Sequence, residues 1–157
     1  MRPLLKDTTI EVQVYHIEDV KSSPRQYEMH HMNTDIKLET TLEKINFRKG
    51  DIYIPMNQAA NRFILEALEP QGGDSYFAWN FFDGILGQKE GFSAYVFEDI
   101  AAAYLQEHAE LKTKLEERKA GDSAFAKSAR AQLDFIFKNS PFYEPAHMRY
   151  PVYRIIK

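Results

Sequence analysis

The first third of the chain alternates between apolar and polar residues. In residues 8–17, three β-branched residues fall on alternate positions, which is the period of a strand with one buried face. Residues 18–26 contain two serines and a proline and break the pattern, so a loop is expected there. A second extended region follows, because apolar residues alternate again in residues 36–38 and 45–47.

A short polar connection separates two of these alternating segments. Residues 49–51 are Lys-Gly-Asp, and residues 52–54 are apolar again. A glycine in so short a connection favours a tight turn. The pattern therefore predicts a hairpin that joins residues 45–47 to residues 52–54. Pro55 ends the second strand or places it at a sheet edge, because proline has no N–H for a ladder.

The period changes from two to about 3.6 near residue 58. Apolar residues in 58–68 recur at helical spacing, with Asn57 as a candidate N-cap and Pro70 as the stop. A second helix is predicted over residues 74–86, capped by an aspartate or a serine at its start. Its aromatic residues would also suit a strand.

The rest of the chain is more regularly helical. Residues 96–106 are rich in alanine, and residues 109–120 carry a line of leucines among charges. A last helix is predicted over residues 123–140, with a cap at its start and a proline after it. The tail, residues 141–157, is spaced by prolines, and its residues 152–156 are expected to add a strand to the earlier sheet.

Strand patterns therefore come before helical patterns. This order predicts an α+β fold, in which an antiparallel sheet from the N-terminal half packs against a helical C-terminal half. The length of 157 residues fits one domain. We expect residues 1–56 to be mainly β, residues 57–140 mainly helical, and residues 141–157 extended.

Composition narrows the classes of partner. The net charge is −3 and basic residues are interleaved with acidic ones, so nucleic acid is not an expected partner. There is no cysteine, which excludes disulfides and thiolate chemistry. No apolar run approaches the ~20 residues of a membrane helix, so no membrane partner is expected. No signal-peptide pattern is visible either, and the residues alone give no localisation.

Residues 69–98 are the most unusual stretch of the chain. They contain eight of the 21 aromatic residues, including the only tryptophan. Trp79, with Tyr76 and Phe77, is either part of the core or a platform that stacks on a sugar or a peptide. The second alternative would make the chain a stand-alone glycan- or peptide-binding module.

Polar residues in and near this stretch are expected to have structural roles. We expect Asp74, Asn80 and Asp83 to cap helices or bond to the backbone, and Arg62 to pair with an aspartate. The alternative is a hydrolase in which Asp74, Asp83 and Glu90 act as acid and base, which would require them to face one another across a cleft.

No catalytic or metal-binding motif is present. The five histidines offer neither His-x-x-Glu nor His-Glu-x-x-His. Glu144 and His147 have the reverse spacing with a proline between them, and His30 and His31 lie in a segment that we expect to be extended, where neighbours face opposite ways. Neither a Gly-x-Ser-x-Gly elbow nor a phosphate-binding loop occurs. No catalytic residue, metal ligand or cofactor is therefore assigned to this chain.

Three phrases of the sequence carry a family resemblance: IPMNQAANRFILEALEP, DSYFAWNFFD and YEPAHMRYPVYR. They resemble phrases in the C-terminal region of large bacterial zinc carboxypeptidases of the carboxypeptidase A class. The resemblance covers nearly the whole chain and is most specific over residues 47–99 and 140–155.

The resemblance implies that catalysis belongs to another domain of the same polypeptide. In this family an upstream domain binds zinc through a His-x-x-Glu pair and a later histidine, and removes C-terminal amino acids from peptides by zinc-activated water. None of those signatures occurs here, so the chain is expected to be a non-catalytic accessory domain from a longer, exported protein, periplasmic or extracellular. Its expected partners are the upstream catalytic domain of the same polypeptide and a peptide substrate.

Overall fold

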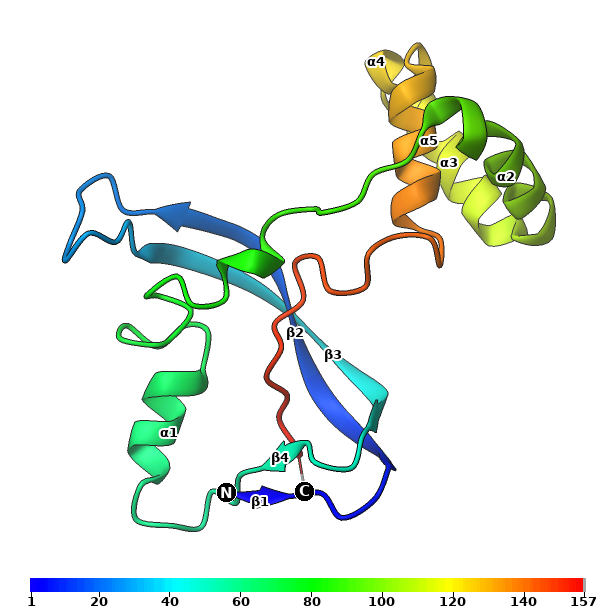
Figure 1. Ribbon diagram of the computed structural model, residues 1–157. Coiled ribbons are helices and arrows are strands. Elements are labelled where there is room, and N and C mark those ends of the chain that lie inside the picture. The colour runs from blue at the N-terminus through cyan, green and yellow to red at the C-terminus, as the bar shows by residue number, and fades with distance from the viewer. Residues whose placement is uncertain (157) are drawn as a thin grey trace. The chain divides into compact units, whose positions relative to one another are not determined.

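The computed structural model describes residues 1–156 and has an α+β fold (Figure 1). Within the described residues the strands lie in residues 2–53 and the helices in residues 61–138. This order confirms the fold class that the sequence pattern predicts. No helix among these residues has the length and apolar character needed to cross a membrane.

The chain divides into two compact units. The first contains residues 1–87 and 146–156, and the second contains residues 88–145. The sequence pattern does not predict this division, because the last residues of the chain belong with the first.

A long antiparallel hairpin forms the frame of the first unit. Strand β2 (Thr8–Ser22) pairs with strand β3 (Asn33–Phe47), in a register that runs from Thr8↔Phe47 to Ser22↔Asn33 with irregularities near Asp19. The predicted strand at 8–17 is therefore part of a longer one, and most of the expected loop at 18–26 is strand. Both segments of the second extended region belong to β3.

The predicted hairpin around residues 49–51 is wrong. Strand β4 (Ile52–Tyr53) pairs with strand β1 (Arg2–Pro3), and not with β3. The turn itself forms, since Gly50 adopts a φ of +98° that favours glycine. However, Gly50 N donates to Leu4 O, and Leu4 N donates to Asp51 O. These bonds tie the turn to the N-terminal segment.

The tail returns beside β2. Tyr150 N donates to Tyr15 O, and Gln13 and Arg154 exchange backbone hydrogen bonds. The tail thus joins the sheet edge as expected, but through isolated antiparallel bridges and not as a continuous strand. Pro151 has no N–H to donate, which interrupts the ladder between these contacts.

Helix α1 (Asn61–Leu68) begins three residues later than predicted. Its N-cap position is Ala60, which offers no side-chain acceptor, so Asn57 does not cap it. The predicted helix at 74–86 is wrong. This segment is a series of turns that ends in a short 3-10 helix, Asp83–Ile85, and Asn80 interrupts the helical path with a φ of 68°.

The core of the first unit joins distant parts of the chain. Tyr15 and Ile17 of β2 pack with Phe77 from the turn segment and with Tyr150 from the tail. The Tyr150 ring contacts the rings of Tyr15, Phe77 and Phe82. Of the aromatic residues in residues 69–98, Phe77 and Phe82 therefore pack in the core of this unit.

The second unit is helical. It contains α2 (Ala94–Glu107), α3 (Ala109–Gly121), α4 (Ser123–Ala126) and α5 (Ala129–Lys138). The predicted last helix is thus two helices, each with its own cap. Asp122 accepts bonds from Ala124 N and Phe125 N at the start of α4, and Ser128 accepts one from Ala131 N at the start of α5.

The helical unit has its own apolar core. Seven buried residues from all four helices form it: Phe97, Ala101, Leu111, Leu115, Phe125, Ile136 and Phe137. Phe92, before α2, packs against both Phe97 and Phe137, with ring centroids 5.0 and 4.9 Å apart.

Candidate functional site

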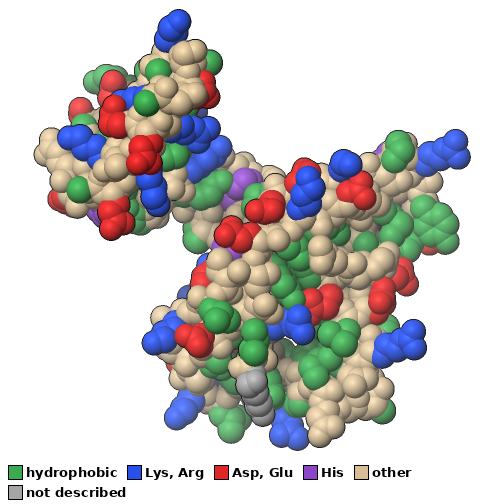
Figure 2. All heavy atoms as spheres, turned by 180° about the vertical axis from the view of Figure 1, so that it is seen from behind, with side chains coloured by type: hydrophobic (Ala, Val, Ile, Leu, Met, Phe, Trp, Pro, Cys, Tyr) green, Lys and Arg blue, Asp and Glu red, His purple; other side chains and the backbone are tan. Residues whose placement is uncertain are grey.

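A cleft of about 1020 Å³ opens within the first unit. We call it the apolar cleft. In the lower part of Figure 2 a hollow with hydrophobic side chains at its border is visible. The walls of the apolar cleft are Ile64, Leu65, Leu68 and Glu69 at α1, residues 51–57 around β4, Leu4, Ile10 and Val12, residues 45–47 of β3 and residues 151–155 of the tail.

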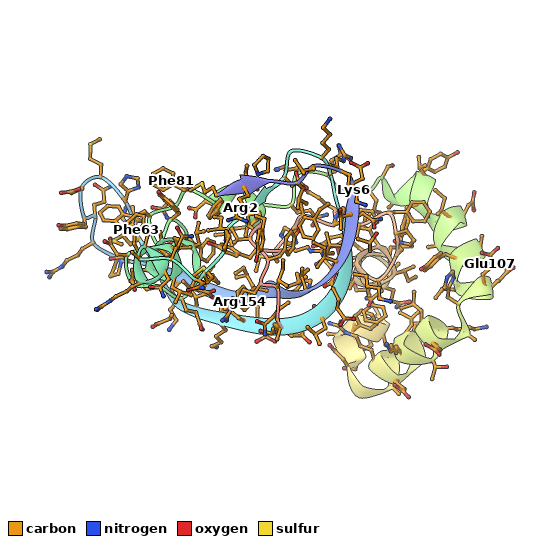
Figure 3. All side chains as sticks on the ribbon, turned by 90° about the horizontal axis from the view of Figure 1, so that it is seen from below. Arg2, Lys6, Phe63, Phe81, Glu107 and Arg154 are labelled. Carbon is orange, nitrogen blue, oxygen red and sulfur yellow. The ribbon has the colours of Figure 1, made fainter. Side chains whose placement is uncertain are left out.

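Helix α1 turns one apolar side toward the cleft. Ile64, Leu65 and Leu68 line it, a spacing that places them on neighbouring positions of one helical face. Phe63 lies outside the lining and is 69% exposed. Figure 3 shows Phe63 on α1 directed away from Arg154, whereas Arg154 lies on the inner side of the curved β2–β3 ribbon.

A polar group of three side chains stands at the wall of the cleft. Tyr15 Oη donates to Glu69 Oε2 at 2.8 Å, and Arg154 Nη1 donates to Tyr15 Oη at 2.9 Å. Arg154 Nε lies 3.4 Å from Glu69 Oε1. The group links the end of α1, β2 and the tail, so it fixes the relative positions of three walls.

The pKa values of Tyr15 and Arg154 are both raised within this polar group. Burial raises the pKa of Tyr15; the hydrogen bond from Arg154 acts in the opposite direction, and Glu69 raises the pKa further. The hydrogen bond to Tyr15 raises the pKa of Arg154. Tyr15 is therefore a neutral donor and Arg154 a cation near neutral pH, and neither is poised for proton transfer.

A second polar group, centred on Glu43, connects the tail to the β2–β3 hairpin. Arg149 Nη2 donates to Glu43 Oε2 at 2.6 Å, while His16 Nε2 and Thr41 Oγ1 lie 2.9 and 2.8 Å from Glu43 Oε1. Among the described residues, Arg149 Nε is buried without a hydrogen-bond partner. The Arg149 guanidinium also lies over the ring of Tyr153, 5.7 Å from its centroid.

The lining determines what the cleft can bind. Most of its side chains are apolar, and several at its rim remain exposed: Ile52 at 58%, Leu65 at 44% and Ile155 at 41%. Several exposed apolar side chains grouped around one cleft indicate an interaction site, whereas single exposed apolar side chains are common on any protein surface. In residues 1–156 no cluster of three or more histidine, aspartate or glutamate side chains could hold a metal ion. The apolar side chains of the lining favour contact with an apolar partner surface.

The three aromatic residues that the sequence singles out have different environments. Phe77 is completely buried and packs on Tyr150, so it belongs to the core and not to a surface platform. Tyr76 is 42% exposed and its ring meets the ring of Phe81, with centroids 5.3 Å apart. Trp79 is half-buried.

Trp79 packs against the tip of the β2–β3 hairpin. Its ring centroid lies 5.7 Å from that of Tyr27 and 5.5 Å from that of His30. The indole Nε1 donates to Asp74 Oδ1 at 2.5 Å. His30 lies outside the two long strands, and it forms an isolated antiparallel bridge with Tyr27 that closes the tight turn of this hairpin.

Of the three polar residues that we expect to cap helices or bond to the backbone, only Asn80 bonds to the backbone, whereas Asp74 and Asp83 accept hydrogen bonds from side chains. Asp83 accepts bonds from Asn33 Nδ2 at 2.7 Å and Asn80 Nδ2 at 3.1 Å, and Asn80 Nδ2 also lies 3.1 Å from His31 O. Arg62 is exposed on α1 and forms no ion pair within residues 1–156. Its position on the solvent side of the helix separates it from the aspartates.

The acid–base alternative gains no support from these contacts. Asp74 accepts a hydrogen bond from the Trp79 indole, and Asp83 accepts hydrogen bonds from two asparagine side-chain amides. Glu90 belongs to the helical unit, where its backbone carbonyl accepts a bond from Gln88. Asp74 and Asp83 are thus each occupied in structural bonds.

Sequence reasoning missed most of the cleft. Glu69, Arg154 and Tyr15 lie far apart in the chain, and no local pattern marks them as neighbours. One signal was available: a tail whose apolar residues alternate with Arg149 and Arg154 is unusual for a solvated terminus. It could have indicated that the tail is bound along a polar and apolar surface.

Comparisons with protein-family models, with curated proteins and with solved structures found no match.

Proposed function

We propose that this chain is a non-catalytic accessory domain of a zinc carboxypeptidase-like protein. In this proposal the apolar cleft is the surface on which the upstream catalytic domain of the same polypeptide packs. The parent protein would remove C-terminal amino acids from peptides, and zinc would belong to the upstream domain.

The observation that carries the proposal is the joint role of the three resembling phrases. Residues 54–70 supply α1 and the part of the lining that directly follows β4, and residues 143–154 supply most of its tail side. The middle phrase, residues 74–83, supplies Phe77, which packs on Tyr150. Phrases that resemble one family thus build one apolar surface and the core beneath it.

The exposed rim supports a packing role. A cleft with side chains such as Ile52 and Leu65 exposed to water gains free energy when a partner covers it, at roughly 25 cal/mol per Å² of apolar area. Within residues 1–156 no segment of the chain covers these side chains. A neighbouring domain would supply that cover.

Variants of one helix test this role in the longer protein. Leu65→Glu puts a charge into the cleft, whereas Phe63→Glu puts the same charge on the exposed side of α1. We expect Leu65→Glu to lower the thermal stability of the longer protein and the activity of its catalytic domain. Phe63→Glu should leave both near the wild-type values. Equal effects of the two variants would contradict the proposal.

The coding sequence upstream of this chain gives a second test. The proposal requires a His-x-x-Glu pair and a later histidine there. It also requires that the 157-residue chain alone neither binds zinc stoichiometrically nor cleaves a C-terminal peptide reporter. Stoichiometric zinc with chelator-sensitive activity in this chain alone would contradict it.

A glycan- or peptide-binding module is the second candidate. One observation favours it: the half-buried Trp79 lies beside Tyr27, which is 59% exposed, so an aromatic surface reaches solvent. Oligosaccharides or peptides that shift the Trp79 fluorescence, with loss of the shift in Tyr27→Ala, would support it. A blue-shifted emission that neither ligand nor quencher alters would reject it.

A further inference from the structure

The tail residues that line the apolar cleft follow the helical unit in sequence. Residues 151–155 line the cleft, and residues 88–145 lie between the turn segment after α1 and the part of the tail that belongs to the first unit. The tail therefore reaches β2 only by closing a loop that contains the whole helical unit. The free-energy cost of closing a loop rises with the length of flexible chain in it.

The helical unit holds its own two ends together by a polar contact. Lys89 N donates to Glu144 Oε2 at 2.9 Å, and Lys89 Nζ lies 3.9 Å from Glu144 Oε1. The Glu144 side chain is 17% exposed, so water competes little for it. These two residues lie next to the first and last positions of the unit. The connection between the two parts of the first unit is therefore short while they are paired.

Both ends also pack on one side chain of the helical core. The ring of Phe92, near the first end, has its centroid 4.9 Å from that of Phe137. The ring of Tyr143, near the last end, has its centroid 5.7 Å from that of Phe137. Phe137 is buried and belongs to α5. The folded core of the helical unit thus keeps the two ends side by side.

We propose that folding of the helical unit stabilises the tail in its position as a wall of the apolar cleft. While the unit is folded, its joined ends replace a flexible loop of roughly 60 residues by a short connection. When the unit unfolds, its ends separate, and the tail must close the long loop to stay on β2. Loosening of the helical unit therefore releases this wall. As regulation of a docking surface, the inference rests on the proposed function.

The size of the effect follows from the length of the loop. Each doubling of a flexible loop makes its closure about threefold less favourable. Unfolding of the helical unit lengthens the flexible connection from a few residues to roughly 60, which is about three doublings or more. The population of molecules with an undocked tail should therefore rise by at least about tenfold.

The test is hydrogen–deuterium exchange in the 157-residue chain. The reporters are the amides of Gln13, Tyr150 and Arg154, because each donates a backbone bond between β2 and the tail. Phe137→Ala should unfold the helices, since a unit of this size is marginally stable, and circular dichroism would show the loss. The reporters should then exchange at least about tenfold faster. The emission of Trp79, the only tryptophan, should show that the first unit stays folded.

Glu144→Ala keeps the helical core and removes the polar contact between the ends. It should speed the exchange of the reporters roughly fivefold, which is the effect of losing about one hydrogen bond. Glu116→Ala is the matched control, because Glu116 lies within α3 and pairs with Lys119 at 2.8 Å. It should leave the exchange of the reporters near the wild-type rate.

Unchanged exchange of the reporters in Phe137→Ala, with the helical signal lost, would overturn the proposal. Equal exchange in Glu144→Ala and Glu116→Ala would also overturn it, and this comparison decides if Phe137→Ala unfolds both units. Both comparisons use the 157-residue chain without an upstream domain. Failure of this inference and failure of the proposed function are therefore separate outcomes.

Discussion

The ring of Tyr150 meets the ring of Phe77 nearly edge to face, with centroids 5.6 Å apart, and both residues are completely buried. One comes from the tail and the other from the turn segment after α1. This contact holds the last residues of the chain in the first unit.

Removing either ring should therefore destabilise the fold. Phe77→Ala should cost roughly 3–5 kcal/mol in the free energy of unfolding, because it leaves a cavity in the core. Tyr150→Phe keeps the ring but loses the bond from Tyr150 Oη to Leu68 O, which should cost about 1 kcal/mol. Denaturant unfolding measures both. Phe81→Ala, at a residue that is 70% exposed, is the control and should change stability by about 0.5 kcal/mol or less.

The β2–β3 turn carries avoidable backbone strain. Glu28 and Met29 have φ values of 46° and 68°, and Met29 is 89% exposed. A two-residue turn of this kind favours Asn-Gly, because both central residues need positive φ. The double change Glu28→Asn with Met29→Gly should raise the free energy of unfolding by about 1 kcal/mol. Met29→Val should lower it, and a loss of stability in the Asn-Gly variant would refute this description of the turn.

Acid should weaken the interaction between Glu43 of the hairpin and Arg149 of the tail. Burial raises the pKa of Glu43, but hydrogen bonds from His16 and Thr41 and the charge of Arg149 outweigh it and leave the pKa below its usual value. A carboxyl whose pKa is lower in the folded state stabilises the fold above its unfolded pKa, and this stability is lost as pH falls through the folded pKa. The free energy of unfolding should therefore fall with pH below about 4.5.

Glu43→Gln isolates this contribution. It should lower stability at pH 7 by roughly 1 kcal/mol, through loss of the charge-assisted bonds, and should flatten the acid part of the pH profile. Glu39→Gln, on the same face of β3, is the control and should keep the wild-type slope. Identical pH profiles for the two variants would show that Glu43 is not the group responsible.

The cap of α4 gives a prediction for the helical unit. Asp122 Oδ1 accepts bonds from Ala124 N at 2.9 Å and Phe125 N at 3.0 Å. Asp122→Ala should lower stability by about 1 kcal/mol, followed by helical circular dichroism, whereas Asp122→Asn should keep most of it. A loss in the asparagine variant equal to that in alanine would mean that the side-chain bonds are not what stabilises this end.

Local patterns were predictable, and long-range pairing was not. Alternation located the β2 and β3 segments, and helical spacing located α1, α2 and α3, because both follow from which face is buried. The partner of Ile52 could not be found in this way. It lies in β1, an exposed two-residue strand without alternation, and the bonds of Leu4 to the turn decide the pairing.

The prediction of a helix over residues 74–86 failed for a different reason. Its apolar residues have helical spacing, but Asn80 is in the left-handed region. Its side chain bonds to Asp83 and to the carbonyl of His31, and these tertiary bonds override the local pattern. The apolar cleft was beyond sequence reasoning because its walls come from six separate segments.

Hydrogen–deuterium exchange of the apolar cleft tests the central claim most directly. Backbone amides in residues 52–57 and 64–69 would be followed in the 157-residue chain alone and in the longer protein that contains the upstream region. If a catalytic domain packs on the cleft, these amides should exchange more slowly in the longer protein, while those of the exposed helix α3 should not change. Equal exchange of the cleft amides in the two proteins would contradict the account.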